Sequence, residues 1–193
     1  MIHLKKEAYS VSRWAGGETT QIYIAPAGAS YGDRDFLWRV SSATVELEES
    51  DFTVLADYDR WITTLAGNIT LTHNGGTPVK LAPFEVHRFD GGADTHCLGR
   101  CTDFNLMLRK GMCQGALRTL CLPAGTAQEV GFADTPAFPS ASLVVYCASG
   151  QCLLDGQSLA AGDSVVTGTA ISIKAQSTAQ LIIAEIQYQP PCH

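Results

Sequence analysis

A sequence pattern that occurs twice in the chain constrains the fold more than any other feature of the sequence. The first copy occupies residues 61–90, and a second with the same order of parts occupies residues 143–166. Each copy has an apolar run, a glycine break, a short alternating stretch, a turn containing glycine, and a further apolar stretch. Alternation of period two punctuated by glycine is typical of antiparallel strands joined by tight turns. The sequence therefore predicts that the same hairpin is built twice.

The remainder of the chain adds short strand candidates and almost no helical periodicity. Alternating runs predict further strands, and the acidic residues 48–51 predict a solvated turn. Strands at intervals of about 8–12 residues are typical of sandwiches and barrels. We therefore predict an all-β fold of two small jelly-roll barrels in tandem within one compact chain. Residues 1–110 are expected to form the first barrel and residues 111–193 the second, which shares strands with the first.

Charge limits the classes of partner. The chain has 193 residues and a formal net charge of −6. Nucleic acids and anionic membrane surfaces both require clustered Lys and Arg, so neither is expected as a partner. A small anionic ligand remains compatible, because a few buried arginines make a pocket locally positive.

Cysteines and the absence of long apolar segments predict the compartment. The seven cysteines include no Cys-x-x-Cys pair, and the first residues lack the apolar core of a signal peptide. No run approaches the about 20 apolar residues of a membrane-spanning helix. We expect reduced thiols in a cytoplasmic protein, with the cysteines serving as small buried hydrophobes rather than as nucleophiles.

Two arginines are the first candidates for ligand contacts. Arg39 lies on the same face of its strand as small or apolar residues, and Arg60 opens the strand that begins the first hairpin. An arginine pointing into a barrel needs an anion, and its guanidinium can hold a carboxylate in a bidentate fork. The alternative for each is an internal ion pair, with Asp103 or Glu46 for Arg39 and with Asp57 or Asp59 for Arg60.

Asp103 and Asn105 are the next candidates because they share one strand face and are unusual in mid-strand. Inside a barrel they would offer hydrogen-bond acceptors and a donor to a ligand amide or amine. Thr19 could donate a hydroxyl from the glycine-rich turn that precedes it. Trp14 and Trp38 could wall the pocket, although a large aromatic side chain is more often part of the core. No catalytic acid–base pair or nucleophile is visible, so enzymatic activity is not expected.

Several strings in fixed order resemble the HutD/Ves family of bacterial proteins. They are Trp14 with Gly16-Gly17-Glu18-Thr19, then residues 38–43 (WRVSSA), Arg60 opening the strand to Gly67, Pro83-Phe84, Phe89-Asp90-Gly91, and residues 102–107 (TDFNLM). The resemblance implies a bicupin, a protein of two cupin barrels, with no established enzymatic activity. It also implies a link to histidine utilisation, with formylglutamate as a candidate ligand. Phe89, near the end of the first hairpin, joins Arg60, which comes just before that hairpin, among the expected ligand contacts.

The chain departs from the family pattern at one point. Members of the family commonly have a longer turn after the tryptophan and a glutamate in the strand that follows. Here the turn is Ala15-Gly16-Gly17, and Gln21 stands where the glutamate is expected. A pocket built partly from this turn is expected to differ in its ligand preference.

Two other functions remain open at this stage. Metal-dependent cupins bind their ion through a His-x-His pair, a glutamate and a third histidine. The five histidines here (His3, His73, His87, His96 and His193) include no such pair, so no metal or other cofactor is expected. A metal-dependent isomerase or hydrolase using His73, His87 or His96 is nevertheless the alternative. A third possibility is a homodimer through an apolar face of the second hairpin, which carries only Asp155 between residues 143 and 159.

Overall fold

The computed structural model describes residues 1–132 and 137–190. Within these residues the chain forms 19 β-strands and one short 3-10 turn, η1 (Lys6–Ala8), without any α-helix. The all-β prediction is confirmed. The strands divide into two compact units, a first unit Ser10–Gly111 and a second unit in which Met1–Tyr9 join Met112–His193. None of the helical segments in the described part of the chain is long and apolar enough to cross a membrane.

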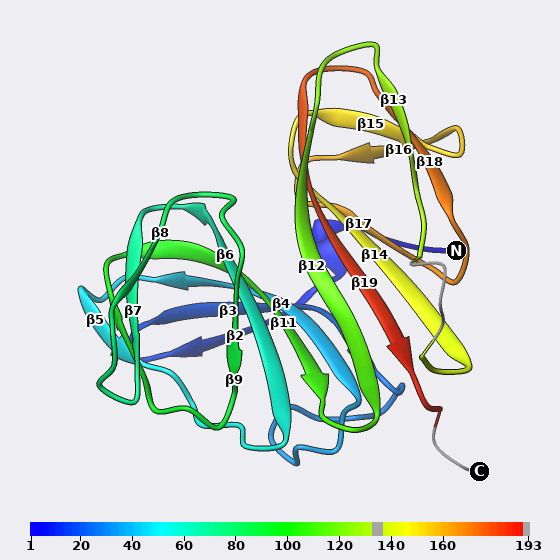
Figure 1. Cartoon of the computed structure of the whole chain (residues 1–193). Helices are drawn as coiled ribbons and strands as arrows, with labels where there is room; N and C mark the ends of the chain where they lie inside the picture. The colour runs from blue at the N-terminus through cyan, green and yellow to red at the C-terminus, as the bar shows by residue number, and fades with distance from the viewer. Residues whose placement is uncertain (133–136, 191–193) are drawn as a thin grey trace. The chain divides into compact units, whose positions relative to one another are not determined.

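The first unit consists of a six-stranded and a four-stranded antiparallel sheet (Figure 1). The larger sheet has the order β2-β3-β4-β11-β6-β9 and the smaller one the order β5-β10-β7-β8. Buried residues of both sheets, such as Ile62 and Leu71, form one apolar cluster, so the sheets pack face to face. The strands are β2 (Ser10–Trp14), β3 (Gly17–Ala25), β4 (Trp38–Val45), β5 (Glu49–Asp51), β6 (Tyr58–Ala66), β7 (Ile69–His73), β8 (Val79–Leu81), β9 (His87–Asp90), β10 (Thr95–Leu98) and β11 (Cys101–Arg109).

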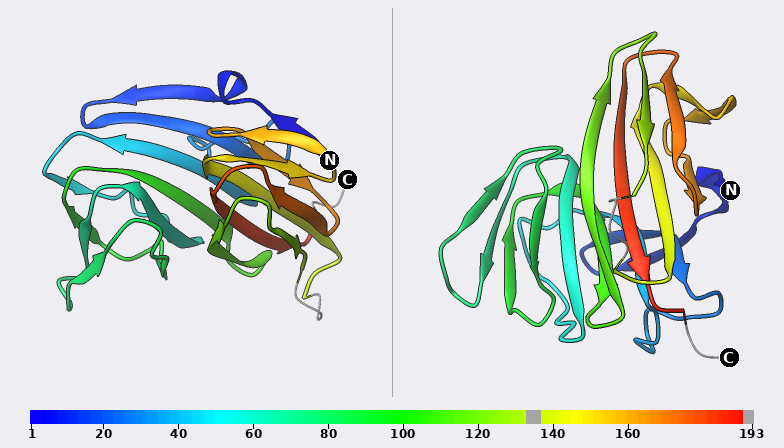
Figure 2. Two further views of the ribbon diagram at one scale, coloured as in Figure 1. Left: turned by 90° about the horizontal axis from the view of Figure 1, so that it is seen from above. Right: turned by 45° about the vertical axis from the view of Figure 1, so that its right-hand side comes forward.

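The second unit repeats this plan with a five-stranded sheet, β1-β17-β14-β19-β12, and a four-stranded sheet, β13-β18-β15-β16. Both views of Figure 2 show its long strands β12, β14 and β19 running side by side. Its core is a cluster of 15 buried apolar residues contributed by both sheets. The strands are β1 (Ile2–Leu4), β12 (Cys113–Leu122), β13 (Ala127–Val130), β14 (Ser140–Ser149), β15 (Gln151–Leu154), β16 (Gln157–Ala160), β17 (Ser164–Thr167), β18 (Ile171–Ala175) and β19 (Ala179–Tyr188).

The repeated hairpin predicted from the sequence is confirmed strand by strand. In the first unit β6 pairs with β9 and β7 pairs with β8, while in the second β14 pairs with β17 and β15 pairs with β16. The two glycine breaks, Gly67 and Gly150, have φ values of 83° and 82°. A Cβ at either position would lie 2.3 Å from a backbone carbonyl oxygen, that of Arg100 or Thr178. Glycine is therefore required at both turns.

The boundary between the units differs from the prediction of 1–110 and 111–193. Met1–Tyr9 group with the second unit because β1 pairs with β17 along its edge. Two side-chain contacts hold this segment, an ion pair of 2.7 Å between Lys5 Nζ and Asp163, and a 2.8 Å hydrogen bond from Tyr9 to Ser164. An exposed alternating segment of nine residues does not reveal from its own sequence which edge it will join.

The expectation of a solvated turn over residues 48–51 is wrong. Glu49–Asp51 form the short edge strand β5, which pairs with β10. The strand is acidic because its outer face meets solvent, where Asp51 accepts a 2.8 Å hydrogen bond from His96.

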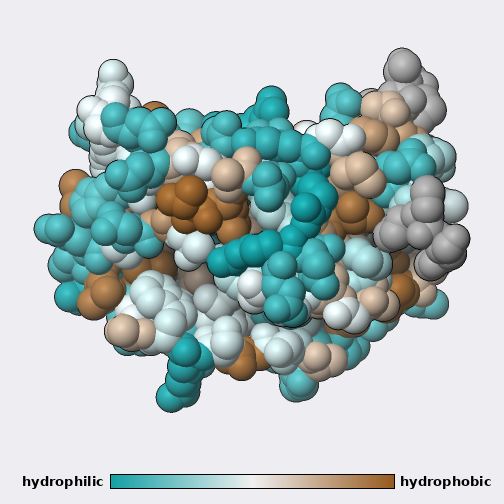
Figure 3. Space-filling view, turned by 90° about the horizontal axis from the view of Figure 1, so that it is seen from below, coloured by the Kyte–Doolittle hydropathy of each residue, from teal (hydrophilic) through white to brown (hydrophobic). Residues whose placement is uncertain are grey.

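The apolar hairpin of the second unit folds its large side chains inward. Leu143, Leu154 and Leu159 are each fully buried within the unit's own core. The large apolar side chains that are exposed lie elsewhere, among them Val11, Trp14 and Leu98. On the face shown in Figure 3, apolar side chains are interspersed with hydrophilic ones.

Candidate functional site

A cavity of about 390 Å³ opens between the sheets of the first unit. Its lining mixes apolar side chains with an unusual number of buried polar ones. The polar residues that carry the argument are Thr19, Arg39, Ser41, Arg60, Asp103 and Asn105.

Strand alternation brings these side chains to the same interior. In the larger sheet β11 lies between β4 and β6. Across β4 and β11, Ser41 stands opposite Asn105 and Ala43 stands opposite Asp103, while Arg60 stands opposite Met107 across β6 and β11. Residues opposite one another in antiparallel strands point to the same face, so three neighbouring strands present their polar positions to one cavity.

Arg39 is held by neutral partners only. Its Nε donates to Gln21 Oε1 at 3.0 Å and its Nη1 donates to Ser41 Oγ at 2.9 Å. Its guanidinium lies 4.5 Å from the centre of the Tyr31 ring. Burial lowers the pKa of Arg39 to about 10, so the side chain remains charged at neutral pH.

Arg60 is more deeply buried and less well satisfied. Its guanidinium lies 5.0 Å from the ring centres of both Phe52 and Phe89. Its Nη2 donates to Asn105 Oδ1 at 3.3 Å and its Nη1 to the Thr53 carbonyl at 3.4 Å, both long contacts. Its buried Nε has no hydrogen-bond partner among the described residues. Burial is the main cause that lowers the pKa of Arg60.

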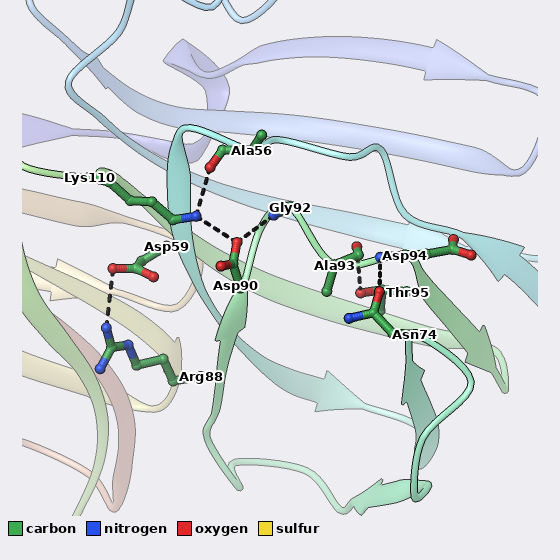
Figure 4. Close-up of polar contacts among 10 residues, drawn as sticks. All are labelled: Ala56, Asp59, Asn74, Arg88, Asp90, Gly92, Ala93, Asp94, Thr95 and Lys110. Atoms are coloured by element: carbon green, nitrogen blue, oxygen red, sulfur yellow. Dashed lines mark hydrogen bonds and ion pairs between the residues drawn. The ribbon is translucent and has the colours of Figure 1, made fainter.

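Neither arginine forms the internal ion pair considered above. Within residues 1–132 and 137–190, no carboxylate lies within salt-bridge distance of Arg39 or Arg60. Asp59 instead pairs with Arg88 on the other side of β6, at 3.1 Å (Figure 4). The cavity therefore carries two cations whose charge the protein leaves without an adjacent counterion.

Asp103 and Asn105 form a second polar group in the cavity. Asp103 Oδ1 accepts from the Ala43 backbone amide at 2.9 Å and from Asn105 Nδ2 at 2.8 Å. Asn105 thus links Asp103 to Arg60 through its two amide atoms. Burial raises the pKa of Asp103 to about 6, although these hydrogen bonds act in the opposite direction.

The structure separates the remaining predicted residues into two groups. Trp14 and Thr19 line the cavity, and Trp14 is 43% exposed. Trp38 does not line it, since it is buried and stacks on Tyr23 at 5.0 Å. Phe89 lies behind the lining, where its ring contacts Arg60.

Other cavity residues were not predicted from the sequence. They include Tyr31, which follows β3 in a loop, Ser50 and Asp51 of β5, and Phe52 after it. Gln21, the partner of Arg39, stands out in the sequence only because the family pattern has glutamate at its position. Its side chain reaches the cavity arginine next to a register shift between Gln21 and Tyr23, an irregularity that strict alternation does not predict.

The histidines do not fit a metal centre. Among the described residues no group of three or more His, Cys, Asp or Glu side chains is placed to hold an ion. His73 Nε2 and His87 Nε2 lie 2.9 Å apart, but the ring centroids are 5.1 Å apart with 21° between the planes. The nitrogens therefore point at each other, as in a hydrogen bond, instead of converging on a third point as metal ligands do.

Each unit has two sheets packed around its own apolar core. This repeated arrangement defines a protein of the cupin fold with two small barrels. Solved structures agree. A conserved protein of unknown function from Pseudomonas aeruginosa PAO1 is 23% identical, covers 96% of this chain and 98% of its own, and has a TM-score of 0.79. HutD from Pseudomonas fluorescens SBW25 is 22% identical, with 97% and 98% covered and a TM-score of 0.77. The bacterial pirin YhhW of Escherichia coli, solved with nickel(II), is 11% identical, with 99% of each chain covered and a TM-score of 0.71.

The family is shown by sequence. The family model described as HutD matches residues 6–183. The chain belongs to the HutD family. A search of curated proteins finds no match.

Proposed function

We propose that this protein binds a small carboxylate-bearing metabolite in the cavity of the first unit and senses or sequesters it. The observation that carries the proposal is the pair of buried arginines, Arg39 and Arg60, without a carboxylate beside them. Removing an ion from water costs several kcal/mol unless an opposite charge or good hydrogen bonds replace the water. A bound carboxylate would supply both.

The charge balance of the cavity supports an anion. Among the buried side chains of the lining, Arg39 and Arg60 contribute two positive charges, and an ionised Asp103 contributes one negative charge. The other carboxylate of the lining, Asp51, is exposed and accepts a hydrogen bond from His96. The buried part of the cavity therefore carries one net positive charge when Asp103 is ionised and two when it is protonated. The free donors of the arginines favour a planar carboxylate, which a guanidinium binds with two parallel hydrogen bonds.

The polar groups near Arg60 favour a ligand that has hydrogen-bonding groups in addition to its carboxylate. Asp103 and Asn105 present a carboxylate and an amide a short distance from Arg60. These groups suit a ligand N–H and a ligand carbonyl. Formylglutamate and other intermediates of histidine degradation have this combination and are the candidates that membership of the HutD family favours. We also propose a location in the bacterial cytoplasm, where reducing conditions keep cysteine thiols reduced.

Isothermal titration calorimetry with formylglutamate, urocanate, histidine and glutamate tests the proposal. We expect at least one of these compounds to bind. We expect Arg39→Gln and Arg60→Gln each to weaken that binding by roughly 10- to 100-fold, because each removes a charge-assisted hydrogen bond worth about 1.5–3 kcal/mol.

Arg88→Gln is the matched control. It also removes one positive charge from the first unit, but its side chain is exposed and paired with Asp59 outside the cavity. An equal loss in all three variants would indicate a general effect of charge, and no binding of any compound would contradict the proposal.

A further inference from the structure

Two histidines of the first unit meet end to end beside the cavity arginine. His73 belongs to β7 and His87 to β9, and their Nε2 atoms are 2.9 Å apart. A hydrogen bond of this kind needs one proton between the two nitrogens, since each neutral ring can offer either a donor or a lone pair at Nε2. We call this pair the histidine dyad.

Thr95 determines which ring donates. Its hydroxyl donates to the carbonyl of Ala93 at 3.2 Å (Figure 4), so its oxygen is available to accept from His73 Nδ1–H at 2.9 Å. His73 then carries its proton on Nδ1 and accepts at Nε2, and His87 donates from Nε2. The dyad is neutral in this state, and an additional proton would make it a cation.

A single aromatic ring lies between the dyad and the binding site. The His73 ring centroid is 4.8 Å from that of Phe89, and the Arg60 guanidinium lies 5.0 Å from the same Phe89 ring. Arg60 and Phe89 are also directly opposed across β6 and β9. Arg60 and Phe89 are buried whereas both histidine rings are partly exposed, so a charge on the dyad and the charge of Arg60 interact with partial screening by water.

Few other charges face the dyad. Of the strands around it, β6 contributes Arg60, β11 contributes Asp103 beyond Arg60, and β10 contributes the neutral Thr95. The remaining charged neighbours have other partners or are exposed. On β9, Arg88 pairs with Asp59 and Asp90 pairs with Lys110 (Figure 4). His96 of β10 contacts Asp51, and Lys80 of β8 and Asp94 are exposed. Arg60 is thus the charge best placed to affect the dyad.

We propose that the histidine dyad is a proton-binding site that regulates how tightly the cavity holds its anion. The proposal rests on the proposed function, because it concerns the same cavity. A proton on the dyad adds positive charge behind Arg60 and strengthens the attraction for a carboxylate. By thermodynamic linkage, a carboxylate bound at Arg60 strengthens proton binding by the same factor.

The direction of the effect follows from the electrostatics. Burial lowers the pKa of both histidines, and for His73 the neighbouring His87 and Arg60 lower it further. The dyad is therefore neutral at neutral pH and gains its proton only as the pH falls. Affinity for the anion is expected to rise in the acid direction.

The first experiment needs no ligand. Titration of the imidazole signals by NMR is compared among wild type, Arg60→Gln and Arg60→Lys. Loss of the charge in Arg60→Gln is expected to raise the pKa of His73, while Arg60→Lys, which keeps the charge on a shorter chain, is expected to leave it low. His96, which faces solvent, is the internal control and is expected not to respond. An unchanged His73 titration in Arg60→Gln would overturn the coupling.

The second experiment adds formate, the smallest carboxylate, and follows binding by NMR between about pH 8 and pH 5, where histidine changes charge. It is done in an Asp103→Asn background, because Asp103 also titrates in this range. Formate is expected to bind roughly three- to tenfold more tightly at the acid end, consistent with typical coupling between sites. This gain is expected to vanish on adding His73→Gln or, if that variant does not fold, His87→Gln.

The outcomes separate the two proposals. Formate binding that does not depend on pH would overturn regulation by the dyad and leave the proposed function intact. Absence of formate binding in every variant would count against the proposed function, while the ligand-free comparison of Arg60→Gln with Arg60→Lys would still decide whether the dyad and Arg60 are coupled.

Discussion

The two units of this protein are built on one plan but have opposite interiors. In the second unit the space between the sheets is filled by 15 buried residues, all of them aliphatic or cysteine. In the first unit the corresponding cluster has eight residues and a separate cluster has four, and the interior also contains a cavity lined by buried polar side chains. The fold therefore does not require the cavity, since the same pairing of strands packs well without one.

The strand pairing shows which positions of the two units are equivalent and which residue types differ there. Both units have a register shift next to the glycine turn, between Thr102 and Asp103 in one and between Cys147 and Ser149 in the other. Counting along the strands from this shift gives the equivalent positions, which are Leu143 for Arg60, Leu181 for Asp103 and Ile183 for Asn105. Three leucine or isoleucine positions of one core are thus charged or polar in the other.

The difference indicates a division of labour. Each fully buried leucine or isoleucine contributes about 1.5–3 kcal/mol from the hydrophobic effect, and its replacement by a buried polar group forfeits this. The second unit keeps that contribution. The first unit lacks this hydrophobic contribution at three positions, and a loss of stability of this kind is typical of binding sites.

The largest expected effect comes from moving the charge into the apolar unit. Leu181→Arg places a guanidinium at the position equivalent to Asp103, where the residues opposite it in the neighbouring strands, Leu120 and Cys147, offer no carboxylate. We expect it to lower the free energy of unfolding by about 3–5 kcal/mol, the usual cost of an unpaired buried charge. Urea denaturation followed by circular dichroism measures it.

Leu181→Met is the control, since it keeps the volume and apolar character and is expected to cost less than about 1.5 kcal/mol. Equal stability of the arginine and methionine variants would mean that the second interior accepts a charge as readily as the first. The two interiors would then not differ in their tolerance of a buried charge.

The next effect concerns Asp103, whose counterpart is Leu181. Burial raises its pKa from the ordinary 3.8 to about 6, so between these values the folded protein holds a proton that the unfolded chain has lost. Its contribution to stability is therefore fully present below about pH 4 and is lost as the pH rises through 6. We expect the difference in unfolding free energy between wild type and Asp103→Asn to change by about 2–3 kcal/mol across this interval.

The measurement is urea denaturation of both proteins at a series of pH values. Asp103→Leu, which installs the residue type of the second unit, provides a check because it also removes the titrating group. The two variants are expected to show the same pH dependence even where their stabilities differ. A wild-type profile parallel to theirs would show that Asp103 is not the group that titrates.

Much of this contrast is readable in the sequence, because strand alternation is local. The period of two in residues 36–48 and 102–109 places Arg39 on one face of its strand and Asp103 with Asn105 on one face of theirs, without any knowledge of the rest of the chain. The same reasoning finds the repeated hairpin, since its glycines are demanded by backbone geometry at the turn. The strands and their polar faces can therefore be predicted from residues that lie close together in the sequence.

What the sequence does not predict depends on contacts between distant segments. Tyr31 reaches the cavity from a loop, and Glu49–Asp51 become a strand only because β10 offers its edge. Whether Arg39 finds a carboxylate or a neutral partner depends on a register shift at Gln21. The absence of an ion pair, on which the proposed function rests, could not be read from the alternation.

The smallest expected effect tests that partner. Gln21 Oε1 accepts from Arg39 Nε at 3.0 Å, at the position where the HutD/Ves pattern commonly has glutamate. In Gln21→Glu the new carboxylate would neutralise Arg39 and compete with the ligand for it. We expect about tenfold weaker binding of the carboxylate ligand, equivalent to about 1.4 kcal/mol, measured by the same calorimetry.

Gln157→Glu is the matched control, because it adds the same charge on an exposed position of the second unit. An affinity unchanged in Gln21→Glu would mean that Arg39 does not contact the ligand, and that Arg60 holds the carboxylate without it. A tenfold loss would instead identify the glutamine as the residue that keeps Arg39 available, so that a neutral side chain beside a buried cation helps to set the charge preference of the site.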